Sequence, residues 1–222
     1  MIKKLIPSFV KDYIYEKVIE SQVKARIRIE NAIPKYDLEA KHLCNTKILK
    51  DRQVLIEQMP HYGIAAELGV DQGQFSEKIL DRNEPGKLYL IDVWKTNRYH
   101  EGLMEKINQR FSKEIDSGQV ELIRDYSTSA VNQFEDDYFD WIYIDTDHSY
   151  EVTKRELEAY APKIKKSGLI AGHDFVTSRY VKNFRYGVIE AVYEFCINHN
   201  WELIFLTMEN TIPPSFAIKR IQ

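Results

Sequence analysis

Apolar residues change their spacing along this chain, and the change divides it into two parts. Residues 8–33 carry apolar side chains at helical spacing, and a second helical segment is expected over residues 37–58. From Ile64 onward, short apolar runs alternate with helical patterns. The sequence therefore predicts an N-terminal helical cap over residues 1–58, followed by an α/β domain over residues 59–222.

Seven short apolar runs are predicted to form the strands of the α/β domain. They are residues 64–70, 87–93, 120–126, 140–145, 169–174, 201–208 and 215–221. The last two are separated by six residues, too few for the crossover that parallel neighbours need, so this pair must be antiparallel. The expected fold is a Rossmann-like three-layer α/β sandwich. Its seven-stranded sheet is mostly parallel, with an antiparallel final strand.

Composition narrows the class of protein. The chain is 44% hydrophobic and 29% charged with a net charge of −3, as in ordinary soluble globular proteins. No apolar run approaches the roughly 18–20 residues of a membrane helix. Cys44 and Cys196 lie far apart without metal-ligand spacing, so two reduced thiols in a cytoplasmic protein are expected. Residues 1–50 hold eleven basic and six acidic residues, but the interleaved acids indicate a solvated helix face rather than a nucleic-acid site.

Polar residues gather directly after two neighbouring predicted strands. Asp145, Asp147 and His148 follow the fourth strand, and His173 and Asp174 follow the fifth. Parallel strands place both groups at the same edge of the sheet, where open α/β sheets bind ligands. The sequence therefore predicts a site at this edge.

The ends of the first two strands suggest a cofactor. Gly69 and Gly73 stand where the first strand turns into a helix, but without the GxGxxG spacing of nicotinamide enzymes. Glu67 beside this turn suits a cationic or amino-bearing ligand better than a pyrophosphate. Asp92, at the end of the second strand, could accept hydrogen bonds from the ribose hydroxyls of an adenosine cofactor, or could cap a helix.

The third strand ends in Asp125, Tyr126 and Ser127, where an adenine ring would bind. The side chain of Asp125 could accept a hydrogen bond from the exocyclic amine, while Tyr126 or the backbone meets the ring. Ser127 is open to a second interpretation as a helix cap.

Five segments in order resemble the successive motifs of class I S-adenosylmethionine-dependent methyltransferases: ELGVDQGQFS, LIDVW, IRDYS, YIDTDHSYE and SGLIAGHDF. The branch they resemble contains macrocin-type and cephalosporin-hydroxylase-like O-methyltransferases, and the resemblance covers about residues 60–220. It implies S-adenosylmethionine as the cofactor and a hydroxyl of a small polar acceptor, such as a sugar or glycosylated metabolite, as the target. It also implies a role for each strand end. Glu67, Gly69 and Gly73 would hold the methionine part, Asp92 the ribose, and Asp125, Tyr126 and Ser127 the adenine, with Asp145 also at the cofactor.

The resemblance further implies a catalytic group and a metal site. Metal-dependent members hold a divalent cation with an acid after strand four and an acidic pair after strand five. Asp145 matches the first position, and His173 and Asp174 stand in place of the pair. The histidine suits Mn²⁺, Fe²⁺ or Zn²⁺ better than Mg²⁺, so the sequence leaves the metal open. Asp147 matches the proposed base, and His148 competes for that role unless it is a structural histidine.

Other interpretations stay open at this point. A non-catalytic adenosine-cofactor-binding partner or regulatory protein is one alternative, and a nicotinamide-dependent oxidoreductase is another. The N-terminal helices could cover the carboxyl edge of the sheet or form a homodimer. Arg179, Tyr180, Arg185 and Tyr186 could contact the acceptor, although solvated loop residues are the default expectation.

Overall fold

An eight-stranded sheet forms the centre of the molecule. The computed structural model describes residues 7–95, 101–176, 180–181 and 184–222. The strands run in the order β1-β9-β10-β6-β5-β2-β3-β4, and within this sheet β10 alone is antiparallel to its neighbours. Strand bounds are β1 Lys47–Leu49, β2 Ile64–Leu68, β3 Lys87–Asp92, β4 Val120–Arg124, β5 Phe139–Ile144, β6 Ile164–Gly172, β9 Trp201–Thr207 and β10 Phe216–Arg220. A separate two-stranded sheet pairs β7 (Tyr180–Val181) with β8 (Phe184–Arg185).

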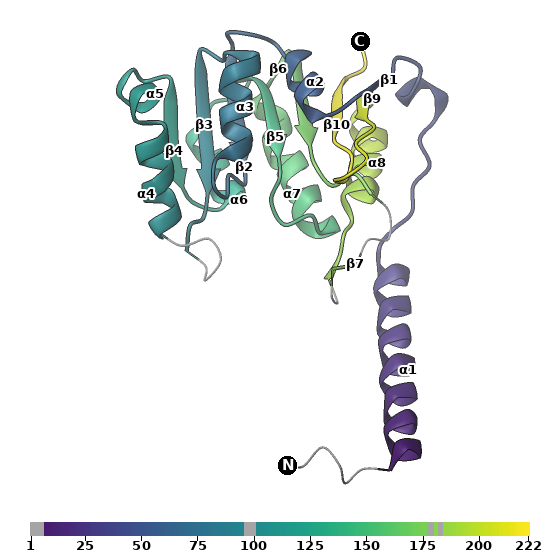
Figure 1. Ribbon diagram of the computed structural model, residues 1–222. Helices are drawn as coiled ribbons and strands as arrows, with labels where there is room; N and C mark the ends of the chain where they lie inside the picture. The colour runs from purple at the N-terminus through teal and green to yellow at the C-terminus, as the bar shows by residue number, and fades with distance from the viewer. Residues whose placement is uncertain (1–6, 96–100, 177–179, 182–183) are drawn as a thin grey trace.

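Helices cover both faces of the sheet and make the three layers expected from the sequence (Figure 1). On one face, α2 (Arg52–Glu57), α3 (Gln74–Asn83) and α4 (Glu101–Arg110) bury Leu55, Ile79 and Ile107 against the strands. On the other face, α6 (Ser127–Ala130), α7 (Tyr150–Tyr160) and α8 (Val188–His199) contribute to a second core cluster. The described residues also form a short helix, α5 (Ser112–Asp116), and three 3-10 helices: η1 (Ala40–His42), η2 (Val131–Gln133) and η3 (Ala161–Lys163).

The sheet has eight strands rather than the expected seven, because the N-terminal segment adds one. The helix expected over residues 37–58 is wrong: this stretch contains η1, β1 and the short α2. Strand β1 pairs in parallel with β9, where Lys47 lies opposite Phe205 and Thr46 Oγ1 donates to the carbonyl of Leu203 over 2.6 Å. A three-residue strand has no detectable period of its own, so it forms only because β9 offers an edge.

The first helix does match the expectation. α1 spans Ser8–Ala32 and extends away from the sheet, with the N-terminus at its far end (Figure 1, purple). Among the described residues, no helix combines the length and apolarity that crossing a membrane would require.

Candidate functional site

A cavity of about 840 Å³ opens at the carboxyl ends of the parallel strands. Every site residue predicted from the sequence lines it except Gly73. Gly73 instead lies directly before α3, as its N-cap residue, in the left-handed conformation with a φ of +72°. A Cβ at this position would lie 2.9 Å from the Phe111 ring. Its role in the structure is to turn the chain into α3.

Gly69 allows two strand ends to approach each other closely. Its φ of +89° favours glycine, and a Cβ at this position would lie 2.1 Å from the carbonyl oxygen of Asp145. No L-residue with a side chain fits without moving the backbone that follows β5. Gly69 therefore brings the turn after β2 against the segment that carries Asp145.

Asp92 ties the turns after β2 and β3 together. Its Oδ2 accepts hydrogen bonds from the backbone N–H groups of Val70 (2.9 Å) and Asp71 (3.0 Å), and its Oδ1 accepts one from Trp94 (3.2 Å). A carboxylate offers about four acceptor positions, so these bonds leave room for a ligand hydroxyl. Asp92 is 8% exposed and lines the cavity, a position compatible with the predicted ribose contact.

The buried Glu67 and the half-buried Asp145 line the cavity together with Arg52. Burial raises the pKa of Glu67 to about 8, although a hydrogen bond from Ser76 opposes the rise. Burial also raises the pKa of Asp145 to about 7, with Arg52 opposing this rise and Asp174 adding to it. The Arg52 guanidinium lies 3.7 Å from Asp145 and 4.4 Å from the centre of the Phe75 ring. At neutral pH, when no ligand cation is present, Glu67 is therefore mostly protonated and Asp145 is about half protonated.

The third strand end is linked to α7 by a buried glutamate. Ser127 is the first residue of α6 rather than its cap, and its hydroxyl donates to Glu156. Thr146 Oγ1 donates to the same carboxyl group over 2.8 Å. Burial raises the pKa of Glu156 to about 7, and these two hydrogen bonds oppose the rise. Asp125 and the exposed Tyr126 also line the cavity, where they were expected to meet adenine.

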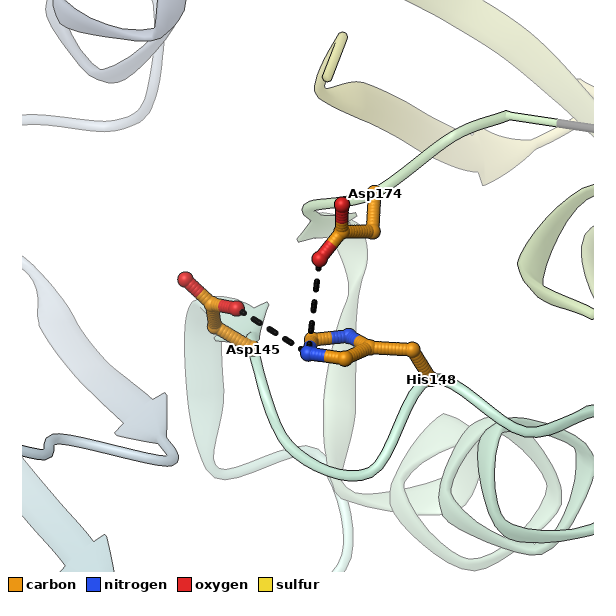
Figure 2. A group of neighbouring side chains, drawn as sticks. All are labelled: Asp145, His148 and Asp174. Carbon is orange, nitrogen blue, oxygen red and sulfur yellow. Dashed lines mark ion pairs between the residues drawn. The ribbon is translucent and has the colours of Figure 1, made fainter. Parts of the chain in front are cut away.

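His148 stands between two acids from neighbouring strand ends (Figure 2). Its Nε2 lies 3.4 Å from Asp174 Oδ2 and 3.8 Å from Asp145 Oδ1. Potential ligand atoms of these three residues lie within 4.8 Å of one another, so the group could hold a metal ion. Asp147 is exposed, and its carboxylate accepts from the backbone N–H of Ser149 over 3.3 Å. The geometry places His148, more than Asp147, beside charged partners.

His173, which was expected among the metal ligands, does not lie in that group. Its Nδ1 lies 3.2 Å from the hydroxyl of Ser215, which in turn lies 2.8 Å from that of Tyr143. Among the described residues, the cluster with ligand-like spacing comprises Asp145, Asp174 and His148. The alternation of side-chain directions along β6 could not predict that His173 lies apart from the cluster, because His173 follows the end of the strand.

Three of the eight described non-glycine residues with a positive φ line the cavity. Asp71, His148 and Asp174 have φ values of +50°, +65° and +55°, and all three line the cavity. Such conformations cost about 1–3 kcal/mol each and persist where the surroundings hold them, as at ligand sites. The chain thus maintains strain where the predicted chemistry would occur.

Among the cavity residues that sequence reasoning missed, Arg52 and Glu156 carry charge at the site. Arg52 comes from α2, in a segment without any motif, and gave no signal. Glu156 did give one, since it occupies the inward face of α7 with Thr153 and Tyr160, where an acid is costly unless it is used. Tyr186, a suggested acceptor contact, lines the cavity and lies 5.0 Å from the His148 ring, whereas Arg179 lies outside the described residues.

The cavity is strongly acidic. Two arginines contribute to its lining, Arg52 and Arg155. Against them stand eight carboxyl groups: Glu67, Asp71, Asp92, Asp125, Asp145, Asp147, Glu156 and Asp174. An environment of this kind attracts a cationic ligand and repels a pyrophosphate. It therefore disfavours the nicotinamide alternative.

Residues 66–175 match the family model of a methyltransferase domain. Among solved structures with a similar fold is a protein from Corynebacterium glutamicum at 12% identity, covering 96% of this chain and 98% of that one, with a TM-score of 0.56. Another is described as a putative rRNA methylase from Clostridium thermocellum, at 14% identity, 78% and 98% coverage, and a TM-score of 0.57. A third, TrmK from M. capricolum in complex with S-adenosylhomocysteine, has 15% identity, 78% and 70% coverage, and a TM-score of 0.54. A search of curated proteins found no match.

Proposed function

We propose that residues 66–175, which match the family model of a methyltransferase domain, form a class I S-adenosylmethionine-dependent methyltransferase domain that methylates a hydroxyl group of a small polar acceptor, a sugar or glycosylated metabolite. The observation that carries the proposal is the position of His148. Its imidazole lies at the cavity, 3.4 Å from Asp174, between the ends of β5 and β6. Alcohols need to lose a proton as they attack, and a histidine held by acids suits that task.

The cofactor lies along the ends of β2, β3 and β4 in this proposal. Asp92 receives the ribose, and the segment from Asp125 to Ser127 receives the adenine. Glu67 and Asp145 face the cationic methionine part, and Arg52 pairs with its carboxylate. The last assignment rests on Arg52 being the guanidinium nearest these two acids.

When bound, S-adenosylmethionine supplies the methyl group: the bond from acceptor oxygen to carbon forms as the carbon–sulfur bond breaks, and the bonding pair stays on sulfur. His148 Nε2 takes the hydroxyl proton. Asp174 and Asp145 stabilise the resulting imidazolium, since both carboxyl groups lie within 4 Å of it. Tyr186 packs beside the His148 ring and limits how that ring can turn.

A divalent cation is a second occupant that the same three side chains fit. Two carboxylates and one imidazole suit Mn²⁺, Fe²⁺ or Zn²⁺ more readily than Mg²⁺. Such an ion would lower the pKa of an acceptor hydroxyl. His148 cannot then be the base through the same nitrogen, so Asp147 would take that role. The two alternatives make opposite predictions for chelation.

Calorimetry with S-adenosylmethionine tests the cofactor, and formation of S-adenosylhomocysteine with a panel of acceptors tests the reaction. The panel comprises sugar hydroxyls, catechols, carboxylates and RNA. We expect binding that Asp92→Ala abolishes, and turnover with the sugars. Binding without turnover on any acceptor would favour the non-catalytic partner, and turnover on RNA alone would refute the small acceptor.

A matched pair of histidine variants tests the base. His148→Gln should remove turnover while cofactor binding persists. His61→Gln should leave turnover intact, because His61 is exposed and does not line the cavity, and its ring lies beside the carbonyl of Glu57 (3.1 Å) and the ring of Tyr62. Activity that survives exhaustive chelation supports His148 as the base. Loss on chelation and recovery with Mn²⁺ would assign the cluster to a cation.

A further inference from the structure

The first helix exposes more apolar surface than any other element of the described chain. Fifteen large hydrophobic side chains are exposed in the described residues, and eight of them belong to α1. They are Phe9, Tyr13, Ile14, Tyr15, Val18, Ile19, Val23 and Ile27. An exposed apolar surface of this kind marks an interaction site.

The stability of a long helix that stands apart from the domain also indicates a partner for α1. Its 25 residues extend over ~37 Å at 1.5 Å per residue, and Figure 1 shows the helix standing apart from the sheet. A helix draws most of its stability from packing one of its faces against other structure. The described residues of the chain leave the apolar side chains of α1 exposed, so a second surface is expected to cover them.

The spacing of the apolar residues indicates another helix as that surface. Tyr15, Ile19, Val23 and Ile27 follow one another at intervals of four and form a ridge along α1. Ridges of this spacing interdigitate when two helices cross at about −50°, the commonest packing class. A membrane-surface helix instead needs its apolar residues on one face. Val18 lies about 140° around the helix from Val23, at 100° per residue, so α1 lacks that single face.

Charge identifies a second copy of this chain as the partner. Reversing the direction of the helix exchanges Tyr15 with Ile27 and Ile19 with Val23. The ridge therefore presents similar side chains to an antiparallel copy of itself. Charged residues of α1 divide along its length. The first half contains Asp12, Glu16 and Glu20 with two lysines, and the second half contains Lys24, Arg26 and Arg28 with one glutamate. Parallel pairing would align like charges, whereas antiparallel pairing aligns opposite ones.

We propose that two copies of this chain associate through an antiparallel crossing of α1, with Glu16 of each copy facing Arg26 of the other. The part of α1 that extends away from the sheet is available for this contact, because the C-terminal end of the helix is fixed to the domain. Glu30 lies 3.1 Å from Arg185, and Arg185 lies 2.6 Å from Glu190 of α8. The dimer contact therefore lies outside the methyltransferase domain, and it does not depend on the reaction proposed above.

Light scattering on the full chain tests the association. The chain has a mass of 26.2 kDa, so light scattering should give about twice that mass for a dimer. Val23→Glu should give the monomer. Val18→Glu is the matched control and should remain a dimer, because both valines are 48% exposed but only Val23 lies on the ridge. Cofactor binding measured on each variant reports whether the domain is folded.

Charge reversal tests the direction of pairing. Glu16→Arg or Arg26→Glu should each weaken the dimer roughly tenfold, and the double variant should restore it, because opposite charges face each other again. A monomeric parent chain at 100 μM concentration would overturn the proposal. So would a dimer that Val23→Glu leaves intact, or a double variant that is weaker than both single variants.

Discussion

Binding of S-adenosylmethionine should be linked to loss of protons from the cavity. The cofactor carries a sulfonium and an ammonium group, and the acids that would face them are partly or mostly protonated at neutral pH in the free protein. The pKa of Asp145 is raised to about 7 and that of Glu67 to about 8, in both cases chiefly by burial. A bound cation favours the ionised form of each acid. Affinity should therefore rise with pH over the range in which the free protein loses these protons.

The size of the effect follows from the pKa values. With a pKa of about 7, roughly one tenth of Asp145 is ionised at pH 6 and roughly nine tenths at pH 8. If the cofactor binds only when Asp145 is ionised, binding is therefore about tenfold tighter at pH 8 than at pH 6. Glu67, with a pKa of about 8, changes over the same range from roughly 1% to half ionised and adds to this increase.

Calorimetry from pH 6 to pH 8 measures this linkage. In buffers of different ionisation enthalpy, it also counts the protons released. Asp145→Asn and Glu67→Gln should each flatten the dependence on pH, and S-adenosylhomocysteine should show a smaller dependence because it lacks the sulfonium charge. The reasoning is wrong if affinity changes less than about threefold across this range. It is also wrong if both variants keep the slope of the parent protein.

Three further outcomes follow from the same geometry. Gly69→Ala should destabilise the fold by more than ~3 kcal/mol in urea unfolding, because its Cβ would meet a backbone carbonyl at 2.1 Å, whereas Gly118→Ala, with φ +80° and nothing within 4 Å, should cost only ~1 kcal/mol. His148→Gln should lower kcat by ~10²–10⁴-fold and remove the acidic limb of the pH–rate profile, while Asp147→Asn has a much smaller effect. Finally, burial raises the pKa of Glu67 to about 8, so the folded chain keeps a proton that the unfolded chain loses above pH ~4.5. Stability therefore falls as pH rises from 5 to 8, and Glu67→Gln should remove up to ~3 kcal/mol of that fall in urea unfolding.

Parallel strand geometry explains why much of the cavity was predictable. Once the alternation of apolar runs and helical patterns indicates a parallel sheet, residues that directly follow the strands must lie at one edge. Asp92 is the last residue of β3, and Asp125 and Asp145 directly follow β4 and β5. All three line the cavity. Their position depends on backbone topology alone, without any knowledge of side-chain direction.

The rest of the site depends on contacts that no local pattern encodes. His148 turns toward Asp174 because its backbone adopts a φ of +65°, whereas His173 faces Ser215. Both histidines follow a strand end, so spacing alone could not distinguish them. Arg52 reaches the cavity from a segment whose neighbouring strand β1 forms only by pairing with β9. Tertiary pairing decides that position, and the helical spacing read in residues 37–58 gave the wrong element.

The acidic cavity also bears on the direction of the proposed reaction. Eight carboxyl groups and two guanidinium groups line it, so a ligand that brings positive charge is favoured over one that does not. In the proposed reaction, transfer of the methyl group would convert a sulfonium into a neutral thioether, while the acceptor proton would pass to His148 beside Asp174. Positive charge thus moves from the cofactor to the protein during the reaction. The acids that attract the substrate cofactor then hold the imidazolium instead, and they attract the product less strongly than the substrate. Release of the product and return of the proton to solvent restore the cavity for another cation.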